Sequence, residues 1–212
     1  MIGLYVLGII VGILVASVLR RTAFKGEPVP FVMELPNYRM PTVKSVALLL
    51  WEKAKDFIER AFTVIFVATI IIWFLQNFDI RFNTVEDSSQ SLLAYIGQWF
   101  AVIFKPLGFG DWRAVTALVS GFSAKEAVVS TLAVLLNTSV NDLHNSLGGM
   151  FTTLSATSFL AFTLLYTPCV AAVATIKREL KSTWATIEVV LMQCTIAYLV
   201  ALIIYQVGSL FL

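Results

Sequence analysis

Long runs of apolar residues, separated by short stretches that hold most of the charges, form the main pattern of this sequence. A helix needs about 20 residues to span the hydrocarbon core of a bilayer. Because the apolar runs come close to that length, we expect an all-α, polytopic integral membrane protein with about six hydrophobic helices. The predicted segments are about 2–19, 58–77, 92–107, 114–136, 151–175 and 184–207.

Segments three and four are less regular than the others. The third is short and ends at Lys105-Pro106, and the fourth contains Ser120-Gly121 and the charged pair Lys125-Glu126. These two segments either cross the membrane separately or form a re-entrant pair. Asp111, just before segment four, is placed to cap its first turn.

A different pattern precedes the second hydrophobic segment. Between residues 42 and 61, apolar side chains recur at helical spacing and most charges fall on the other face. A basic amphipathic helix of this kind is typical of a membrane interface. Upstream, several prolines exclude a regular helix and indicate an extended cytoplasmic connector. The predicted parts are a first transmembrane helix at 1–21, a connector with the amphipathic helix at 22–61, and a transmembrane domain at 58–212.

Composition agrees with a membrane location, and the distribution of charge indicates the orientation of the chain in the membrane. The 212-residue chain is 58% hydrophobic and 13% charged, about half the charged fraction of an average soluble domain. If residue 1 lies outside and all six segments cross, twelve Lys and Arg residues fall in the inner loops, and only Arg81 falls in the outer loops. The positive-inside rule then places both termini outside. Residues 1–19 lack a basic start and are followed by Arg20-Arg21, which indicates a retained helix rather than a cleaved signal.

The first candidate site is the polar part of segment four. An ionisable residue within a membrane costs about 2.5–3.5 kcal/mol on insertion scales and is commonly functional. On a helix, Ser123, Glu126 and Ser130 would form a polar stripe. Gly121 lets the backbone bend, and a broken helix with a polar lining is typical of a transport site. The alternative is a structural ion pair that locks this helix to a neighbour. The candidate pore-lining or gate positions here are Ser120, Gly121, Ser123, Lys125, Glu126, Ser130 and Thr131.

The second candidate site is Tyr166-Thr167-Pro168-Cys169, within segment five. Pro168 cannot donate to the carbonyl of Leu164, so the helix is expected to kink and leave that carbonyl free. Thr167 adds a hydroxyl and Cys169 a thiol, a set that suits a borderline transition metal. The alternative is that Cys169 is simply a small apolar residue. Cys194 has no such break beside it and is expected to pack, and His144 is expected to be a solvated loop residue.

Several enzyme signatures are absent from the sequence, which contains no GxxxxGK[ST], HExxH, GxSxG or paired CxxC. We therefore expect no enzymatic activity and no cofactor in this chain. The net charge of +2 gives no indication of nucleic-acid binding.

Three stretches resemble the ferrous iron transport protein B (FeoB) family. They are PFVMELPNYRMPTVK at 30–44, GFGDWRAVTALVSGFSAKEAVVSTLA at 108–133 and YTPCVAAVATIKRE at 166–179. The second resembles the second gate motif of that family, and the third resembles its TPC-containing helix. Members of the family import Fe²⁺ across the bacterial inner membrane, and they usually carry an N-terminal GTPase domain and two gate repeats.

The resemblance implies a multi-pass component of a ferrous-iron uptake transporter, with Fe²⁺ as substrate and GTP acting only through a domain outside these residues. It implies that the transmembrane domain is of the gate type, and that the bilayer, the GTPase and first gate region (or further copies of the chain) and small accessory iron-transport proteins are its partners. A nucleoside or other small-solute carrier, or a non-transporting assembly subunit, remains the alternative. The residues expected to contact the metal ion are Ser123, Glu126, Thr167 and Cys169, and Pro168 joins the gate positions.

Overall fold

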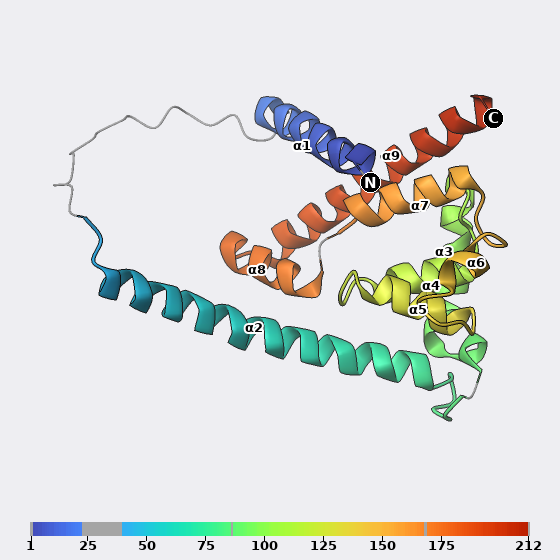
Figure 1. The fold of residues 1–212 in the computed structure, drawn as a ribbon, viewed down its shortest axis with the longest axis horizontal. Coiled ribbons are helices and arrows are strands. Elements are labelled where there is room, and N and C mark those ends of the chain that lie inside the picture. Colours follow the sequence, from blue (N-terminus) through green and yellow to red (C-terminus); the bar gives the residue numbers. More distant parts are fainter. Residues whose placement is uncertain (1, 23–39, 86, 168, 212) are drawn as a thin grey trace. The chain divides into compact units, whose positions relative to one another are not determined.

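A computed structural model describes residues 2–22, 40–85, 87–167 and 169–211, and the regular elements of these residues are helices, apart from one isolated bridge between Phe78 and Thr84 (Figure 1). The predicted extended connector lies mostly at 23–39, outside the described residues. The α-helices are α1 (Ile2–Thr22), α2 (Val43–Asn77), α3 (Leu92–Phe104), α4 (Trp112–Ser120), α5 (Ala127–Leu135), α6 (Leu143–Leu147), α7 (Thr153–Leu165), α8 (Val170–Leu180) and α9 (Thr183–Phe211), and the 3-10 helices are η1 (Ser88–Gln90) and η2 (Lys105–Leu107).

The chain divides into two compact units, Met1–Glu59 and Arg60–Leu212. The first contains α1, whose residues are all at least partly exposed. The predicted amphipathic helix and the second hydrophobic segment are one continuous helix, α2, which passes from the first unit into the second. The division into parts at 1–21, 22–61 and 58–212 stays a prediction.

The expectation of an all-α chain with candidate membrane spans is confirmed for the described residues, and the number of about six hydrophobic helices stays a prediction. Within the described residues, three helical stretches are long and apolar enough to cross a membrane: Ile2–Thr22, Thr153–Leu180 and Thr183–Leu210. A fourth candidate is the pair Leu92–Leu107 and Trp112–Ser120, bent by 108° and therefore either a broken span or a re-entrant loop. The apolar part of α2, Phe62–Asn77, is shorter than these candidates.

The bend between α3 and α4 follows from three local features. Helix α3 is continued by η2, which contains Pro106, and Gly108 then adopts a left-handed conformation with φ of 83°. A Cβ at Gly108 would collide with the ring of Tyr205 in α9, so glycine is required both for the turn and for this close approach. The Asp111 side chain accepts a hydrogen bond from the Arg113 amide at 2.8 Å, which confirms Asp111 as the N-cap of α4.

The fourth hydrophobic segment is not one helix. Helix α4 ends at Ser120 and α5 begins at Ala127, with turns between them. The expected single stripe of Ser123, Glu126 and Ser130 is therefore wrong, because these residues do not share one continuous helix. The Ser123 hydroxyl donates to the Ser120 carbonyl at 2.8 Å, which gives this carbonyl a side-chain partner at the helix end.

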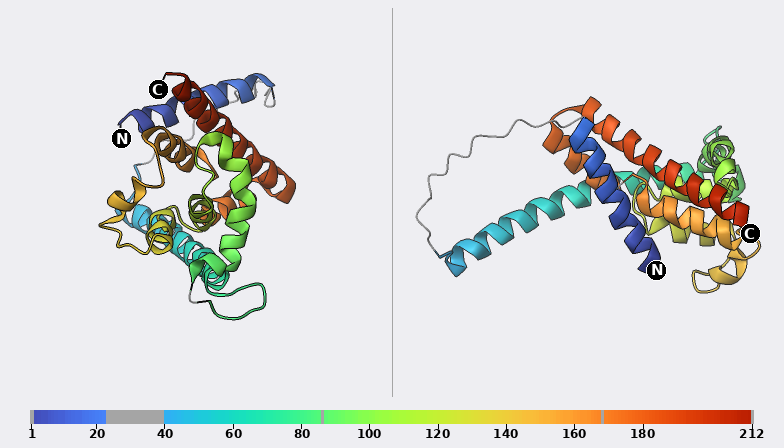
Figure 2. Two further views of the ribbon diagram at one scale, coloured as in Figure 1. Left: turned by 90° about the vertical axis from the view of Figure 1, so that its right-hand side faces the viewer. Right: turned by 90° about the horizontal axis from the view of Figure 1, so that it is seen from above.

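The core of the second unit lies where α7 and α9 pack side by side (Figures 1 and 2). Ala197 and Ala201 are completely buried, and the Ser158 hydroxyl donates to the Ala201 carbonyl at 3.0 Å. Small residues and interhelical hydrogen bonds of this kind allow helices to approach closely in a membrane. Phe159 and Phe162 continue the core toward α4 and the α3–α4 bend.

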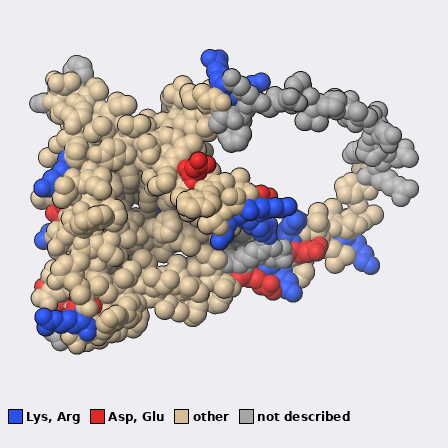
Figure 3. All heavy atoms as spheres, turned by 180° about the vertical axis from the view of Figure 1, so that it is seen from behind, with Lys and Arg blue, Asp and Glu red and all other residues tan. Residues whose placement is uncertain are grey.

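Much of the exposed surface is apolar. On the face in Figure 3, residues other than Lys, Arg, Asp and Glu form most of the surface, and the charges appear in small groups. Exposed large side chains include Phe66 and Trp73 of α2 and Leu191 and Ile203 of α9. A surface of this composition suits contact with lipid.

Candidate functional site

Two interruptions in the helices meet in the second unit. The first break, residues 121–126, separates α4 from α5, and the second break, described at Tyr166, Thr167 and Cys169, separates α7 from α8. The Val170 amide, just after the second break, donates to the Phe122 carbonyl in the first at 3.0 Å. Both regions are candidate sites in the sequence, but nothing in the sequence indicates that they are in contact. In the structure they lie next to each other.

Lys125 connects the first break to the end of α7 by hydrogen bonds. Its ammonium donates to the carbonyl oxygens of Thr163 at 3.2 Å and Leu164 at 3.1 Å. The last carbonyls of a helix lack intrahelical partners and carry partial negative charge, so a cation is favourable there. The carbonyl of Leu164, which the sequence predicts to be free, therefore has the Lys125 ammonium as its partner.

Tyr166 completes the contact between the two breaks. The Lys125 nitrogen lies 5.0 Å from the centre of the Tyr166 ring, within range of a cation–π interaction. The Tyr166 hydroxyl donates to the Leu118 carbonyl at 3.3 Å. A Cβ on Gly121 would stand 2.7 Å from the Tyr166 hydroxyl and collide with Val128, so only glycine fits. Sequence reasoning assigned Tyr166 no role, although an aromatic residue directly before a helix break was a usable signal.

Most buried hydroxyls around the first break are hydrogen-bonded. Ser120 and Thr131 share a hydrogen bond of 2.8 Å between their side chains, and Ser123 bonds to the Ser120 carbonyl. Thr167 differs, because it is only 4% exposed and its hydroxyl has no partner among the described residues. A buried polar group without a partner is uncommon and calls for an explanation, such as a ligand or water.

The remaining predicted site residues are less enclosed. Glu126 and Ser130 are exposed, and the Ser130 hydroxyl donates to the Ala127 carbonyl at 3.2 Å. Cys169 is a partly buried free thiol at the N-cap of α8, and Pro168 lies outside the described residues. Among the described residues, no three His, Cys, Asp or Glu side chains converge as metal ligands. The metal and pore roles of the named residues stay predictions.

The structure also shows the surroundings of His144 and Cys194, two residues for which no role in a site is expected. His144 is exposed in α6, with its Nδ1 3.2 Å from the Asn141 carbonyl oxygen. Cys194 is a partly buried free thiol in α9.

An apolar pocket of about 440 Å³ opens beside the two breaks. Ser123 and Phe122 of the first break line it together with Val170, the first residue of α8. The remaining lining residues come from α2 and are Thr63, Val64, Val67, Ala68, Ile71 and Ile72. Ser123 thus lies between a buried hydrogen bond and an apolar cavity.

These features define a helical membrane protein in which two interrupted helices meet, an arrangement frequent in transporters, where broken helices line the substrate site. Comparison with family models assigns residues 58–183 to the Gate family, described as nucleoside recognition, and residues 1–53 to the family described as ferrous iron transport protein B C terminus. The chain belongs to the Gate family, and it corresponds to the C-terminal membrane region of FeoB, which confirms the resemblance seen in the sequence.

Curated relatives agree with this assignment. The Fe(2+) transporter FeoB of Staphylococcus aureus is 42% identical over 211 residues, covering 99% of this chain and 32% of the relative. The Fe(2+) transporter FeoB of Campylobacter jejuni is 37% identical over 99% of this chain and 36% of its own length. The Fe(2+) transport protein A/Fe(2+) transporter FeoB fusion protein of Porphyromonas gingivalis is 32% identical over 99% of this chain and 30% of its own length. The chain thus spans about a third of these relatives, and no solved structure matches it.

Proposed function

We propose that this chain forms part of the Fe²⁺ permeation pathway of a FeoB-type uptake transporter, and that the path runs past the two joined helix breaks. The observation that carries the proposal is the buried hydroxyl of Thr167, which lies in the second break without a partner among the described residues. The similarity to FeoB along 99% of the chain supports Fe²⁺ as the substrate.

Within this proposal, the ion contacts side chains from both breaks. Thr167 offers a hydroxyl and Cys169 a thiol in the second break, and Ser123 and Glu126 offer oxygens in the first. Sulfur and oxygen together suit Fe²⁺ better than Mg²⁺ or Ca²⁺, which prefer oxygen alone. Lys125 keeps the two breaks next to each other, because its ammonium donates hydrogen bonds to the carbonyls at the end of α7.

The pathway is proposed to lie in a multi-pass protein of the bacterial inner membrane. Six segments cross or enter the bilayer in this arrangement, with α3 and α4 as the bent pair and the basic residues on the cytoplasmic side. The amphipathic first part of α2 lies along the cytoplasmic interface.

The other parts of the transporter are proposed to complete the pore. The chain supplies one gate domain, and the first gate region, the GTPase domain or a second copy of the chain supplies the opposite wall. GTP acts only through that GTPase domain, and the chain itself has no enzymatic role. The name of the Porphyromonas gingivalis relative joins transport protein A to FeoB in one fusion protein, which supports a small accessory iron-transport protein as a further partner.

The test is uptake of radioactive Fe²⁺ by bacterial cells that lack their own ferrous-iron importer. The chain is expressed with the GTPase and first gate portion of a ferrous-iron transporter, and Thr167→Val and Cys169→Ser are compared with the unaltered chain. Both variants are expected to lower the uptake rate by about tenfold or more, the size of effect usual for a group in a metal's immediate surroundings. Unchanged uptake in both variants at equal protein levels contradicts the proposal.

A second candidate function has one observation in its favour, namely that the Gate model is described as nucleoside recognition. If the chain is a small-solute carrier of this kind, the cells should show no Fe²⁺ uptake and should accumulate labelled nucleoside, and Cys169→Ser should not change that accumulation. Nucleosides that compete for uptake favour the small-solute carrier, and Fe²⁺ uptake that nucleosides do not inhibit favours the iron pathway.

A further inference from the structure

A basic pocket lies where α8 ends and α9 begins. It measures about 370 Å³ and is lined by Ala174, Lys177, Arg178, Lys181, Ser182 and Thr183. Three of these six residues are cationic, and all three are exposed. The neighbouring carboxylate is Glu179, which is 3.6 Å from Arg178, so the lining keeps an excess of positive charge.

The start of α9 adds partial positive charge to the same pocket. The first N–H groups of a helix have no intrahelical acceptor, and here the Ser182 hydroxyl accepts one of them, from Ala185, at 3.3 Å. The amides of Thr183 and Trp184 precede it in the first turn and point out of the helix end. Amides and cations together are the donors that bind a phosphate group.

Trp184 places this pocket at the level of lipid headgroups. Its side chain is 81% exposed, and it is the second residue of α9, whose stretch Thr183–Leu210 is long and apolar enough to cross a membrane. Exposed tryptophans at the end of a span are typical of the membrane–water interface. Basic pockets between spans at this depth bind anionic lipid headgroups.

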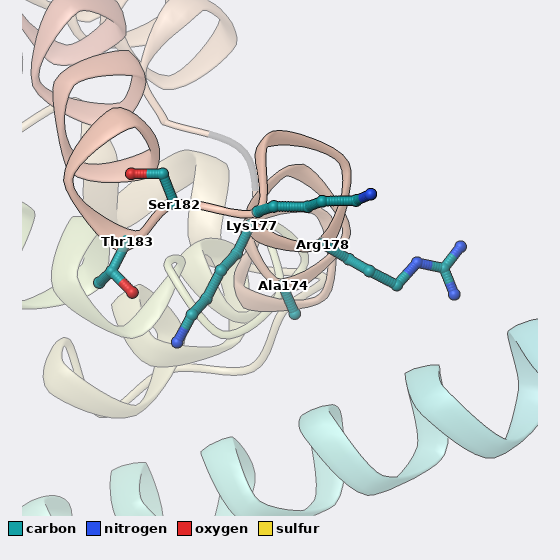
Figure 4. A pocket seen from close by; sticks show the side chains of 6 residues that line it. Ala174, Lys177, Arg178, Ser182 and Thr183 are labelled. Atoms are coloured by element: carbon teal, nitrogen blue, oxygen red, sulfur yellow. The ribbon is translucent and has the colours of Figure 1, made fainter.

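The directions of the side chains favour a lipid over a small free anion. In Figure 4, Lys177 and Arg178 leave α8 in different directions, and the hydroxyls of Ser182 and Thr183 lie on the α9 side. A free phosphate ion would be held best by cations that converge on one point. Donors spread around an open pocket suit a wide headgroup whose acyl chains remain in the bilayer.

We propose that the α8–α9 pocket binds the phosphate headgroup of an anionic phospholipid. Lys177, Arg178 and Lys181 supply charge, and the first turn of α9 supplies amide donors. This site is separate from the Fe²⁺ pathway proposed above and does not depend on it. The bound lipid would hold the ends of two candidate spans at a fixed depth.

The test is native mass spectrometry of the full chain in detergent, titrated with phosphatidylglycerol or with phosphatidylcholine of the same acyl chains. The unaltered chain is expected to retain one phosphatidylglycerol and to prefer it at least tenfold over phosphatidylcholine. Lys177→Gln, Arg178→Gln and Lys181→Gln combined should weaken phosphatidylglycerol retention at least tenfold. A matched control, Lys44→Gln, Lys53→Gln and Lys55→Gln combined, removes the same charge from α2 and should retain the lipid.

Three results would overturn the proposal. They are equal retention of the two lipids, full retention by the α8–α9 triple variant, and release of phosphatidylglycerol by millimolar inorganic phosphate, which would indicate a free-anion site. Circular dichroism checks that the triple variant is folded. If it is not, Lys177→Gln alone, at an exposed position, is expected to weaken retention about threefold, and unchanged retention in this variant also contradicts the proposal.

Discussion

The side-chain nitrogen of Lys125 lies 3.1 Å from the backbone carbonyl oxygen of Leu164, 39 residues further along the chain. This hydrogen bond joins the break between α4 and α5 to the break between α7 and α8. A second link, from the Val170 amide to the Phe122 carbonyl, connects the same two segments. The two interruptions therefore form one structural unit.

Lys125→Met is expected to destabilise the folded chain by about 1–3 kcal/mol, because it leaves the carbonyls of Thr163 and Leu164 without their donor. Lys125→Arg keeps the charge and should recover much of that loss. The measurement is the thermal unfolding midpoint in detergent, with Lys53→Met, at an exposed position of α2, as control. Equal midpoints for Lys125→Met and Lys53→Met would show that the link contributes nothing.

Gly121→Ala should be among the most damaging single-methyl changes in the chain. The added Cβ would collide with Val128 and approach the Tyr166 hydroxyl to 2.7 Å, which displaces the ring beneath Lys125. Overpacking of this kind costs about 1–3 kcal/mol. The control is Gly12→Ala in α1, where a Cβ meets no atom within 4 Å. If both variants unfold at the same temperature, the close approach at Gly121 is unimportant.

The hydroxyls of Ser120 and Thr131, 2.8 Å apart, should behave as a coupled pair. A buried hydrogen bond contributes about 0.5–1.5 kcal/mol, and removal of one partner leaves the other unsatisfied. Ser120→Ala and Thr131→Val should each be destabilising, and the double variant should cost less than the two single changes together. Additive losses in this double-mutant cycle would mean that the two side chains act independently.

Thr167→Val separates function from stability. Valine has nearly the shape of threonine, and the threonine hydroxyl has no partner among the described residues, so the exchange should leave the unfolding midpoint unchanged or slightly higher. Under the proposed pathway, Fe²⁺ uptake should nevertheless fall, because the ion would lose the Thr167 hydroxyl as an oxygen ligand. A large drop in the midpoint would point instead to a structural role for this hydroxyl.

The turn at Asp79 is predicted to open in acid. The backbone hydrogen bond from Asn83 is the largest cause that lowers the pKa of the Asp79 carboxyl below its ordinary value; desolvation opposes it, and the backbone hydrogen bond from Arg81 adds to the lowering. Because the folded pKa is the lower one, the stabilisation is present above the ordinary pKa and is lost as the pH falls through the folded pKa. The protection factors of the Arg81 and Asn83 amides, which are corrected for the intrinsic pH dependence of exchange, should fall in that range, and Asp79→Asn should remove this change. Protection factors that do not vary with pH in the unaltered chain would rule this out.

The helices themselves could be predicted from hydrophobic runs, because a membrane segment needs continuous apolar length and little else. The break at residues 121–126 was indicated by Gly121 and by the charged pair Lys125-Glu126. Its form was not, since the pattern of Ser123, Glu126 and Ser130 is equally compatible with an unbroken helix. The choice between the two depends on contacts with Val128 and Tyr166, which are tertiary.

The partners of Lys125 lay beyond sequence reasoning for a related reason. Pro168 predicted a free carbonyl on Leu164, but nothing in the order of residues indicates which cation lies beside it. Backbone carbonyls carry no residue-specific signal, and the nearby Glu126 made an ion pair the obvious alternative. The structure assigns Lys125 to the carbonyls of Thr163 and Leu164 and leaves Glu126 exposed.

The most direct measurement of the central claim is protection of the Cys169 thiol by the transported ion. In a Cys194→Ser background, Cys169 is the only cysteine of this chain, and its rate of alkylation by N-ethylmaleimide can be followed at this chain, without oxygen, in the assembled transporter. If Fe²⁺ passes the joined helix breaks, Fe²⁺ should slow this reaction severalfold, Mg²⁺ should not, and Thr167→Val should weaken the protection. Equal alkylation rates with and without Fe²⁺ would contradict the account.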